Sequence, residues 1–342
     1  MYKKIYLSVI LGVLFFISCK DKKQYYEESG TVFHTLYTIK YEAPYALTDK
    51  IDAELQKFNL SLNPFNPNSI IAKVNNNEAV EVDEWFTEVF NKSMEVSRNS
   101  DGVFDITCAP LVNLWGFGFN KKDSVTPTMI DSLKTFVGYQ KVHLEGKKIV
   151  KDDPRLLLNC SAIAKGYSCD VIARLLEKEG VENYMVLIGG EVVVKGVNQN
   201  GVCWRTGINL PEDDPDGIKN NYDEIVQLCK KGAIATSGNY RNFYIKDGKK
   251  YAHTINPATG YPAGQNILSA TIVAEDCMTA DAYATTFMVL GVEKAKLLAQ
   301  SIPQIEYFII YADNNGQQKV TYSKGMLEYL PNRKTLAILE NP

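Results

Sequence analysis

The stretch GAIATSGNYRNFY, residues 232–244, begins the part of this 342-residue chain that most constrains its fold, and YAHTINPATGYP (251–262) and TADAYATTFMVLG (279–291) continue it. Glycine and proline bend the backbone sharply, whereas threonine, serine, asparagine and aspartate present oxygen atoms. A single histidine, His253, lies among them. Together the three segments predict a site that holds a metal ion and phosphates.

The third segment carries the acidic residue of that site. Its apolar spacing and its alanines predict a helix that begins near Thr279. Asp281 and Thr285 are four residues apart, so both side chains fall on one face of the helix. Taken alone, the pair could simply cap a buried helix, because one carboxylate and one hydroxyl make a poor cation site. His253 could equally be a structural histidine.

The N-terminal residues predict that the protein is exported from the cytoplasm. Two lysines precede the apolar stretch Ile5–Ile17, which is too short to span a bilayer but suits a secretory signal. Ser18 and Cys19 follow this stretch, and polar residues come after them. The junction resembles a bacterial lipobox. We therefore expect a signal peptide at 1–18, a lipid anchor on Cys19 and a polar tether at 19–28, with the globular domain in the periplasm or on the outer face of the cytoplasmic membrane. An ordinary signal peptide is the alternative, and whether the inner or outer membrane holds the anchor stays open.

Composition excludes some functions. The 37 Lys and Arg residues balance 40 Asp and Glu, so a nucleic-acid partner is not expected. The three histidines form no HExxH pattern, so any metal should be a hard cation held by oxygen. Six cysteines besides Cys19 form no CxxC pair, and we expect them to be unpaired, buried small side chains.

Periodicity predicts an α+β fold, because strands and helices mix without a regular βαβ repeat. A sixteen-residue excursion at 209–224 should lie at the surface. We expect strands at Thr31–Tyr41, Tyr184–Ile188 and Glu191–Val197, and helices at Thr48–Phe58, Glu84–Ser100 and Ala164–Glu179.

Familiar phosphate-binding motifs are absent from the sequence. No GxGxxG follows a strand and no GxxxxGK[ST] occurs, which excludes a Rossmann dinucleotide unit and a Walker loop. GYSCD lacks the second glycine of a nucleophile elbow. The remaining candidate is the turn Ser161–Tyr167, where a helix N-terminus and the charge of Lys165 would receive a phosphate. A lysine in a first helical turn is, by itself, more often simply solvated.

Eight blocks in order give the chain a specific resemblance. They are SGTVFHTLYTI (29–39), LSLNPFNPNSIIAKVN (60–75), DGVFDITCAPLVNLWGFG (101–118), SAIAKGYSCD (161–170), VLIGGEVVVKG (186–196), AIATSGNY (233–240), HTINPATGYP (253–262) and ADAYATT (280–286). This series resembles the ApbE-type FAD:protein FMN transferases over nearly all of the expected mature chain. The resemblance implies an FAD-binding domain over 29–342, with mixed sheets packed against helices in a T-fold-like flavin transferase architecture.

It also implies an activity and a set of site residues. Members of the family use Mg²⁺ to transfer FMN from FAD to a threonine hydroxyl of a partner protein, releasing AMP. The metal would be held by Asp281, Thr285 and backbone oxygens near Ala162 and Ala284. Lys165 would hold the pyrophosphate and His253 would accept the proton of the incoming threonine. The FAD site would be lined by Ser29, Phe65, Gly102, Val103, Phe104, Asp105, Asn159, Lys165 and Ile255.

Partners implied by the resemblance are flavin-acceptor subunits of membrane redox complexes. Two other functions stay open at this point. The chain could be an FAD pyrophosphatase, in which water replaces the protein hydroxyl, or a non-catalytic flavin-binding lipoprotein. Asp281, Thr285, Lys165 and His253 argue against pure binding, because a carrier gains nothing from a metal at the pyrophosphate.

Overall fold

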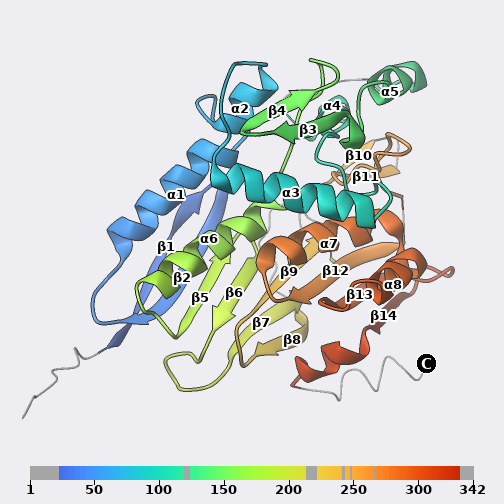
Figure 1. The fold of residues 1–342 in the computed structure, drawn as a ribbon. Coiled ribbons are helices and arrows are strands. Elements are labelled where there is room, and N and C mark those ends of the chain that lie inside the picture. The colour runs from blue at the N-terminus through green and yellow to red at the C-terminus, as the bar shows by residue number, and fades with distance from the viewer. Residues whose placement is uncertain are drawn as a thin grey trace, which may run out of the picture.

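An eight-stranded antiparallel sheet forms the centre of the computed structural model (Figure 1). The structure describes residues 23–118, 124–212, 222–240, 243–246, 249–264 and 266–331, so the expected signal peptide and Cys19 lie outside it. The strands follow the order β1 (Gln24–Val32), β2 (Thr35–Ala43), β5 (Tyr184–Ile188), β6 (Glu191–Lys195), β9 (Gly232–Gly238), β12 (Ile267–Ala274), β13 (Glu306–Ala312) and β14 (Gln318–Tyr322). The α+β class predicted from the sequence is confirmed.

Helices cover one face of the sheet and the region above it (Figure 1). They are α1 (Thr48–Leu62), α2 (Ile70–Asn75), α3 (Glu84–Asn99), α4 (Ala109–Leu114), α5 (Pro127–Lys134), α6 (Ala164–Lys178), α7 (Cys277–Leu290) and α8 (Val292–Gln300), with two short 3-10 helices, η1 (Tyr139–Lys141) and η2 (Lys324–Glu328). Three two-stranded ribbons complete the fold: β3 (Val142–Glu145) with β4 (Lys148–Lys151), β7 (Trp204–Asn209) with β8 (Tyr222–Leu228), and β10 (Phe243–Lys246) with β11 (Lys249–Ala252).

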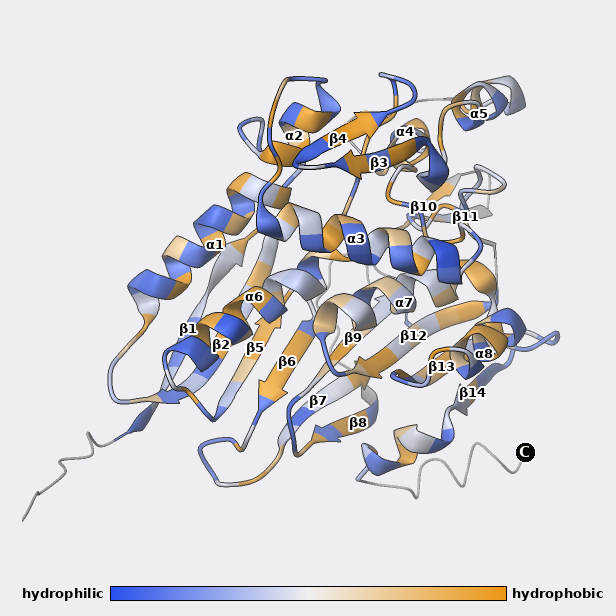
Figure 2. Cartoon of the chain, in the orientation of Figure 1, coloured by the Kyte–Doolittle hydropathy of each residue, from blue (hydrophilic) through white to orange (hydrophobic). Residues whose placement is uncertain are grey.

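Strand β6 shows how the sheet is buried on both sides. Val193 packs into a cluster with residues of α1 and α6, whereas Val192 and Val194 pack against Trp204 of β7 and its neighbours. Successive side chains of a strand point to opposite faces, so the helices and the β7–β8 ribbon cover opposite sides of the sheet. Hydrophobic strands therefore run through the middle of the molecule (Figure 2).

Helix α7 lies between the sheet and α3, and this explains its composition. Tyr283 and Phe287 are fully buried in the cluster that α3 and β12 share. A helix that is apolar on all sides belongs in a core. Asp281 is thus a carboxylate on an otherwise apolar helix, at 2% exposure.

Two sequence-based expectations about local structure were wrong. The strand expected over Thr31–Tyr41 is a hairpin, because Phe33 and His34 turn the chain with φ of 51° and 60°. Neither turn residue is a glycine or proline, so the sequence pattern of the two strands was interpreted as that of one continuous strand. Strand β1 also begins at Gln24, inside the segment expected to be a tether.

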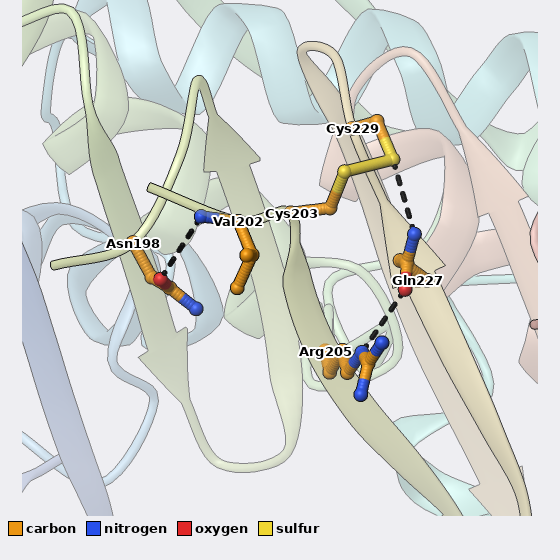
Figure 3. The surroundings of a disulfide bond; sticks show 6 residues. All are labelled: Asn198, Val202, Cys203, Arg205, Gln227 and Cys229. Atoms are coloured by element: carbon orange, nitrogen blue, oxygen red, sulfur yellow. Dashed lines mark hydrogen bonds between the residues drawn. A yellow bond between two sulfur atoms is a disulfide. The ribbon is translucent and has the colours of Figure 1, made fainter. Parts of the chain in front are cut away.

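The expectation of unpaired cysteines was also wrong. Cys203 and Cys229 form a disulfide with their Cα atoms 4.5 Å apart (Figure 3). They flank Trp204 and Leu228, which pair across the β7–β8 ribbon. The ribbon brings together residues separated by 26 positions, which spacing alone did not reveal. The other cysteines in the described part of the chain are free thiols.

The described part of the chain contains no helix with both the length and the apolar character needed to cross a membrane. The surface excursion expected at 209–224 falls mostly on residues 213–221, outside the described residues.

Candidate active site

A cavity of about 450 Å³ opens between the start of α6, one face of α7, the end of β9 and several loops. Most residues singled out in the sequence line it, namely Phe65, Val103, Phe104, Asp105, Asn159, Ala162, Lys165, His253, Ile255, Asp281 and Thr285. Ser29, Gly102 and Ala284 do not line it. Five separate blocks of sequence therefore converge on one cavity of a size typical of small-molecule sites.

The start of α7 is fixed by two carboxylates. Asp276 caps the helix by accepting from the Thr279 backbone N–H at 2.8 Å. Asp170 on α6 accepts from the first two backbone N–H groups of the helix, those of Cys277 at 2.9 Å and Met278 at 2.8 Å. The helix thus begins at Cys277, two residues before the expected start at Thr279. Asp281 consequently lies in the second turn, and not at the helix beginning.

Gly166 lets α6 and α7 approach closely. A Cβ at this position would lie 2.3 Å from the Cys277 carbonyl oxygen and 2.7 Å from Asp281 Cβ, so no larger side chain fits. The Gly166 N–H donates to Asp281 Oδ2 at 2.9 Å. One amide at the α6 N-terminus, expected to receive a phosphate, is therefore engaged by the Asp281 carboxylate.

Lys165 lies between two buried carboxylates. Its Nζ is 2.9 Å from Glu191 Oε1, and 3.4 and 3.5 Å from the two Asp281 oxygens. Burial lowers the pKa of Lys165, but Asp281 and Glu191 outweigh it and raise the pKa above its ordinary value. The ammonium is therefore charged and partly neutralises two carboxylates inside the cavity.

Glu191 is a site residue that the sequence analysis did not single out. It begins β6, is 3% exposed and lines the cavity. Burial raises its pKa to about 7, against the attraction of Lys165. Its Oε2 is buried without a hydrogen-bond partner in the structure, which costs about 1–3 kcal/mol where nothing compensates. The sequence signal that could have identified Glu191 is its position directly before three buried valines in β6, EVVVK.

Hydroxyl groups also line the cavity. Thr285, one turn after Asp281, lies with its Oγ1 3.1 Å from Ser237 Oγ. Thr236 and Gly238 of β9 line the same cavity. The described residues contain no cluster of three or more His, Cys, Asp or Glu side chains that could bind a metal. Because Mg²⁺ takes few carboxylates and keeps waters or substrate oxygens, the Asp281 carboxylate with the Thr285 hydroxyl fits it better than it fits zinc.

Asp105 and Asn159 shape the loops at the other end of the cavity. The two Asp105 oxygens accept from the Thr107 and Tyr139 backbone N–H groups at 2.7 and 2.9 Å. Burial raises the Asp105 pKa, although these hydrogen bonds oppose it. Asn159 Oδ1 accepts from the Ser161 N–H at 2.8 Å. Both side chains are held by backbone groups, so they fix the loops that line the cavity.

Three sequence-predicted residues are not among those that line the cavity. Gly102 forms the turn before this loop, with φ of 77°. Ser29 is exposed on β1 and donates to Thr38 Oγ1 at 3.3 Å. Ala284 is fully buried within α7, where only its backbone could serve the site.

Aromatic side chains form the wall around His253. Its ring lies 6.4 Å from that of Phe117, edge to face. Phe117 in turn stacks on Tyr244 at 5.2 Å, and Trp115 Nε1 donates to the Gly260 carbonyl at 2.8 Å. This bond ties the LWGFG loop to the loop that carries His253. Phe65, which also lines the cavity, is 51% exposed and packs edge to face on the ring of His34 at 5.7 Å.

Comparison with known proteins assigns this chain to a family. A sequence model of the ApbE family matches residues 33–309. The FAD:protein FMN transferase of Vibrio cholerae serotype O1 is 34% identical over 91% of this chain and 95% of its own, and that of Escherichia coli K12 is 32% identical over 85% and 88%.

Solved structures give the same result. The flavin transferase ApbE from Vibrio cholerae superposes with a TM-score of 0.80 at 33% identity, covering 90% of this chain and all of that one. The apo flavinyl transferase ApbE of Pseudomonas stutzeri superposes with a TM-score of 0.78 at 28% identity, covering 91% and 98%. The family resemblance inferred from the sequence is confirmed, and the chain belongs to the ApbE family.

Proposed function

We propose that this chain transfers FMN from FAD to a threonine hydroxyl of a partner protein, in a reaction that depends on Mg²⁺ and releases AMP. Relatives at 32–34% identity over most of the chain are FAD:protein FMN transferases, which supports flavin transfer to a protein as the activity. The observation that carries the finer proposal is the meeting of Asp281, Thr285 and Lys165 in one cavity.

Mg²⁺ is the cation that the donor set favours. Asp281 would supply the carboxylate, Thr285 the hydroxyl, and Ala162 and Ala284 backbone oxygens. When bound, the ion would neutralise charge on the pyrophosphate and make AMP a better leaving group.

The chain's own residues account for the remaining chemistry. Lys165 places a full positive charge in the cavity, where it would hold the pyrophosphate in line for attack. The threonine oxygen attacks the phosphorus of the FMN half, a new P–O ester bond forms, and the bond to the bridging oxygen breaks, so that AMP leaves. His253, on the cavity wall, would accept the hydroxyl proton, since imidazole takes up protons near neutral pH.

The aromatic rings beside His253 support transfer over hydrolysis. Phe117 and the rings stacked behind it make this side of the cavity apolar. An apolar wall excludes water from the reacting phosphorus until an acceptor segment enters. The pyrophosphatase remains the second candidate, because the same residues would act on water.

The test is incubation of the full-length chain with FAD, MgCl₂ and a flavin-acceptor protein. We expect a fluorescent acceptor band on a denaturing gel and an equal amount of AMP, both abolished by EDTA and by Asp281→Ala. AMP release without a labelled acceptor would support the pyrophosphatase. Tight FAD binding with neither product would support a flavin carrier.

We also propose that Cys19 carries a lipid anchor and that the acceptors are flavin subunits of membrane redox complexes. Strand β1 begins at Gln24, so an anchor on Cys19 would hold the domain close to the membrane surface. Metabolic labelling with a radioactive fatty acid should mark the wild-type chain and fail to mark Cys19→Ser. Equal labelling of both would contradict the anchor.

A further inference from the structure

Lys165 is shared unequally between two carboxylates that come from different elements. Its contact with Glu191 on β6 is a normal charged hydrogen bond of 2.9 Å, whereas its contacts with Asp281 on α7 are long, at 3.4 and 3.5 Å. Charge-assisted N–H···O bonds are usually about 2.7–2.9 Å. The ammonium is thus held firmly by Glu191 and only loosely by Asp281.

The second oxygen of Glu191 is an unused acceptor beside this lysine. Oε2 is buried and has no hydrogen-bond partner in the structure. Few buried polar atoms are left without a partner, so such an atom needs an explanation.

The loop between β5 and β6 is shaped around the same pair. A Cβ on Gly189 would lie 3.1 Å from Lys165 Cδ and 3.1 Å from Glu191 Oε2. Its φ of 68° also favours glycine. The absence of a side chain at Gly189 therefore leaves space for Lys165 and Glu191 to lie against the backbone of this loop.

We propose that Glu191 is a positioning residue that holds Lys165 in the cavity when a divalent cation takes Asp281. In the empty site Lys165 supplies the positive charge that faces Asp281. On cation binding Lys165 gives up its long contacts with Asp281, and Glu191 Oε2 accepts the hydrogen bond thus freed. The proposal rests on the proposed function, because it requires Asp281 to be a metal ligand.

A neutral residue at position 191 should therefore lower the affinity of the site for Mg²⁺, although residue 191 is not itself a metal ligand. In Glu191→Gln the ammonium has one carboxylate left and turns to Asp281, with which the metal must then compete. Groups that orient metal ligands typically contribute about 10–100-fold to metal affinity. We expect Mg²⁺ to bind Glu191→Gln about tenfold more weakly than wild type.

The experiment is calorimetric titration of Mg²⁺ alone into the full-length chain, without FAD. Glu177→Gln is the matched control, because Glu177 also pairs with a lysine, Lys231 at 2.9 Å, and lies on α6 outside the cavity. It should bind Mg²⁺ as wild type does.

Lys165→Met should bind Mg²⁺ more tightly than wild type, because no ammonium competes for Asp281. Glu191→Asp, which keeps the charge, should recover most of the affinity lost in Glu191→Gln.

The double variant separates positioning from direct metal contact. If Glu191 acts through Lys165, adding Glu191→Gln to Lys165→Met should change the affinity by less than about threefold, well under the tenfold effect expected above. A full tenfold loss in that background would overturn the proposal. If Lys165→Met does not fold, equal Mg²⁺ affinities of Glu191→Gln and Glu177→Gln would still overturn the proposal.

Failure of the inference and failure of the proposed function look different. Wild-type affinity in Glu191→Gln, with Mg²⁺ binding lost in Asp281→Asn, would overturn only the role of Glu191. Unchanged binding in Asp281→Asn, or no Mg²⁺ binding by the wild-type chain, would contradict the metal site itself.

Discussion

Replacing Gly166 by alanine tests the close approach of α6 and α7 that builds the site. The new Cβ would lie 2.3 Å from the Cys277 carbonyl oxygen, so the helices must separate by about 0.7 Å to reach even a 3.0 Å contact. That shift stretches the 2.9 Å bond from the Gly166 N–H to Asp281 beyond hydrogen-bonding range.

The energetic cost follows from three effects. Overpacking costs about 1–3 kcal/mol, loss of a hydrogen bond to a charged group about 1.5–3 kcal/mol, and alanine returns about 1 kcal/mol of helix propensity. The net destabilisation is about 1.5–5 kcal/mol, or a Tm lower by about 3–10 °C for a domain of this size. Flavin transfer should fall about 100-fold, because Asp281 is displaced by nearly 1 Å.

Differential scanning calorimetry and the acceptor-labelling assay measure the two effects. Gly232→Ala is the control, because a Cβ there would meet Leu228 Cδ2 at 3.6 Å and the Ala274 carbonyl oxygen at 3.8 Å, both ordinary contacts. We expect it to keep its Tm within about 2 °C and its activity. A Gly166→Ala chain as stable and as active as Gly232→Ala would refute the account of the helix contact.

Three further predictions concern other parts of the chain. Burial raises the pKa of Asp170 to about 7, so the folded chain binds more protons than the unfolded chain between about pH 4 and 7. Stability should therefore fall as pH rises through that window, by up to about 4 kcal/mol, and urea unfolding of Asp170→Asn at several pH values should show a flatter profile. Reduction of Cys203–Cys229 should lower the free energy of unfolding by about 3 kcal/mol, from the 26-residue separation, while transfer activity stays, because neither cysteine lines the cavity. His253→Ala should lower kcat about 10²–10⁴-fold with little change in FAD binding by fluorescence titration, and an equal loss in both would show that His253 holds FAD instead of accepting a proton.

The helices and the Asp281–Thr285 pair of the site were predictable because each has a local signal. The alanine-rich apolar segment after Thr279 is long enough to identify a buried helix, and four-residue spacing places Asp281 and Thr285 on the same face. The structure confirms the helix and brings both side chains to the cavity. Its start was missed by two residues, although the capping residue Asp276 directly precedes the helix; the second carboxylate that supports the start, Asp170, lies far away in the sequence.

Two of the features that were missed, Glu191 and the disulfide, depend on partners distant in sequence. Glu191 becomes a site residue only because β6 places it beside Lys165, 26 positions earlier. The disulfide exists because β7 and β8 pair, and the turn at His34 has a backbone conformation that its residue type does not announce. Periodicity reports which face of an element is buried, but not which other element covers it.

The most direct test of the central claim is mass spectrometry of an acceptor protein after incubation with the full-length chain, FAD and MgCl₂. The account predicts an acceptor heavier by one FMN less one water, with the modification on a threonine, and no modification with EDTA or with Asp281→Asn. An acceptor modified equally by wild type and Asp281→Asn would contradict it, as would AMP release with the acceptor mass unchanged.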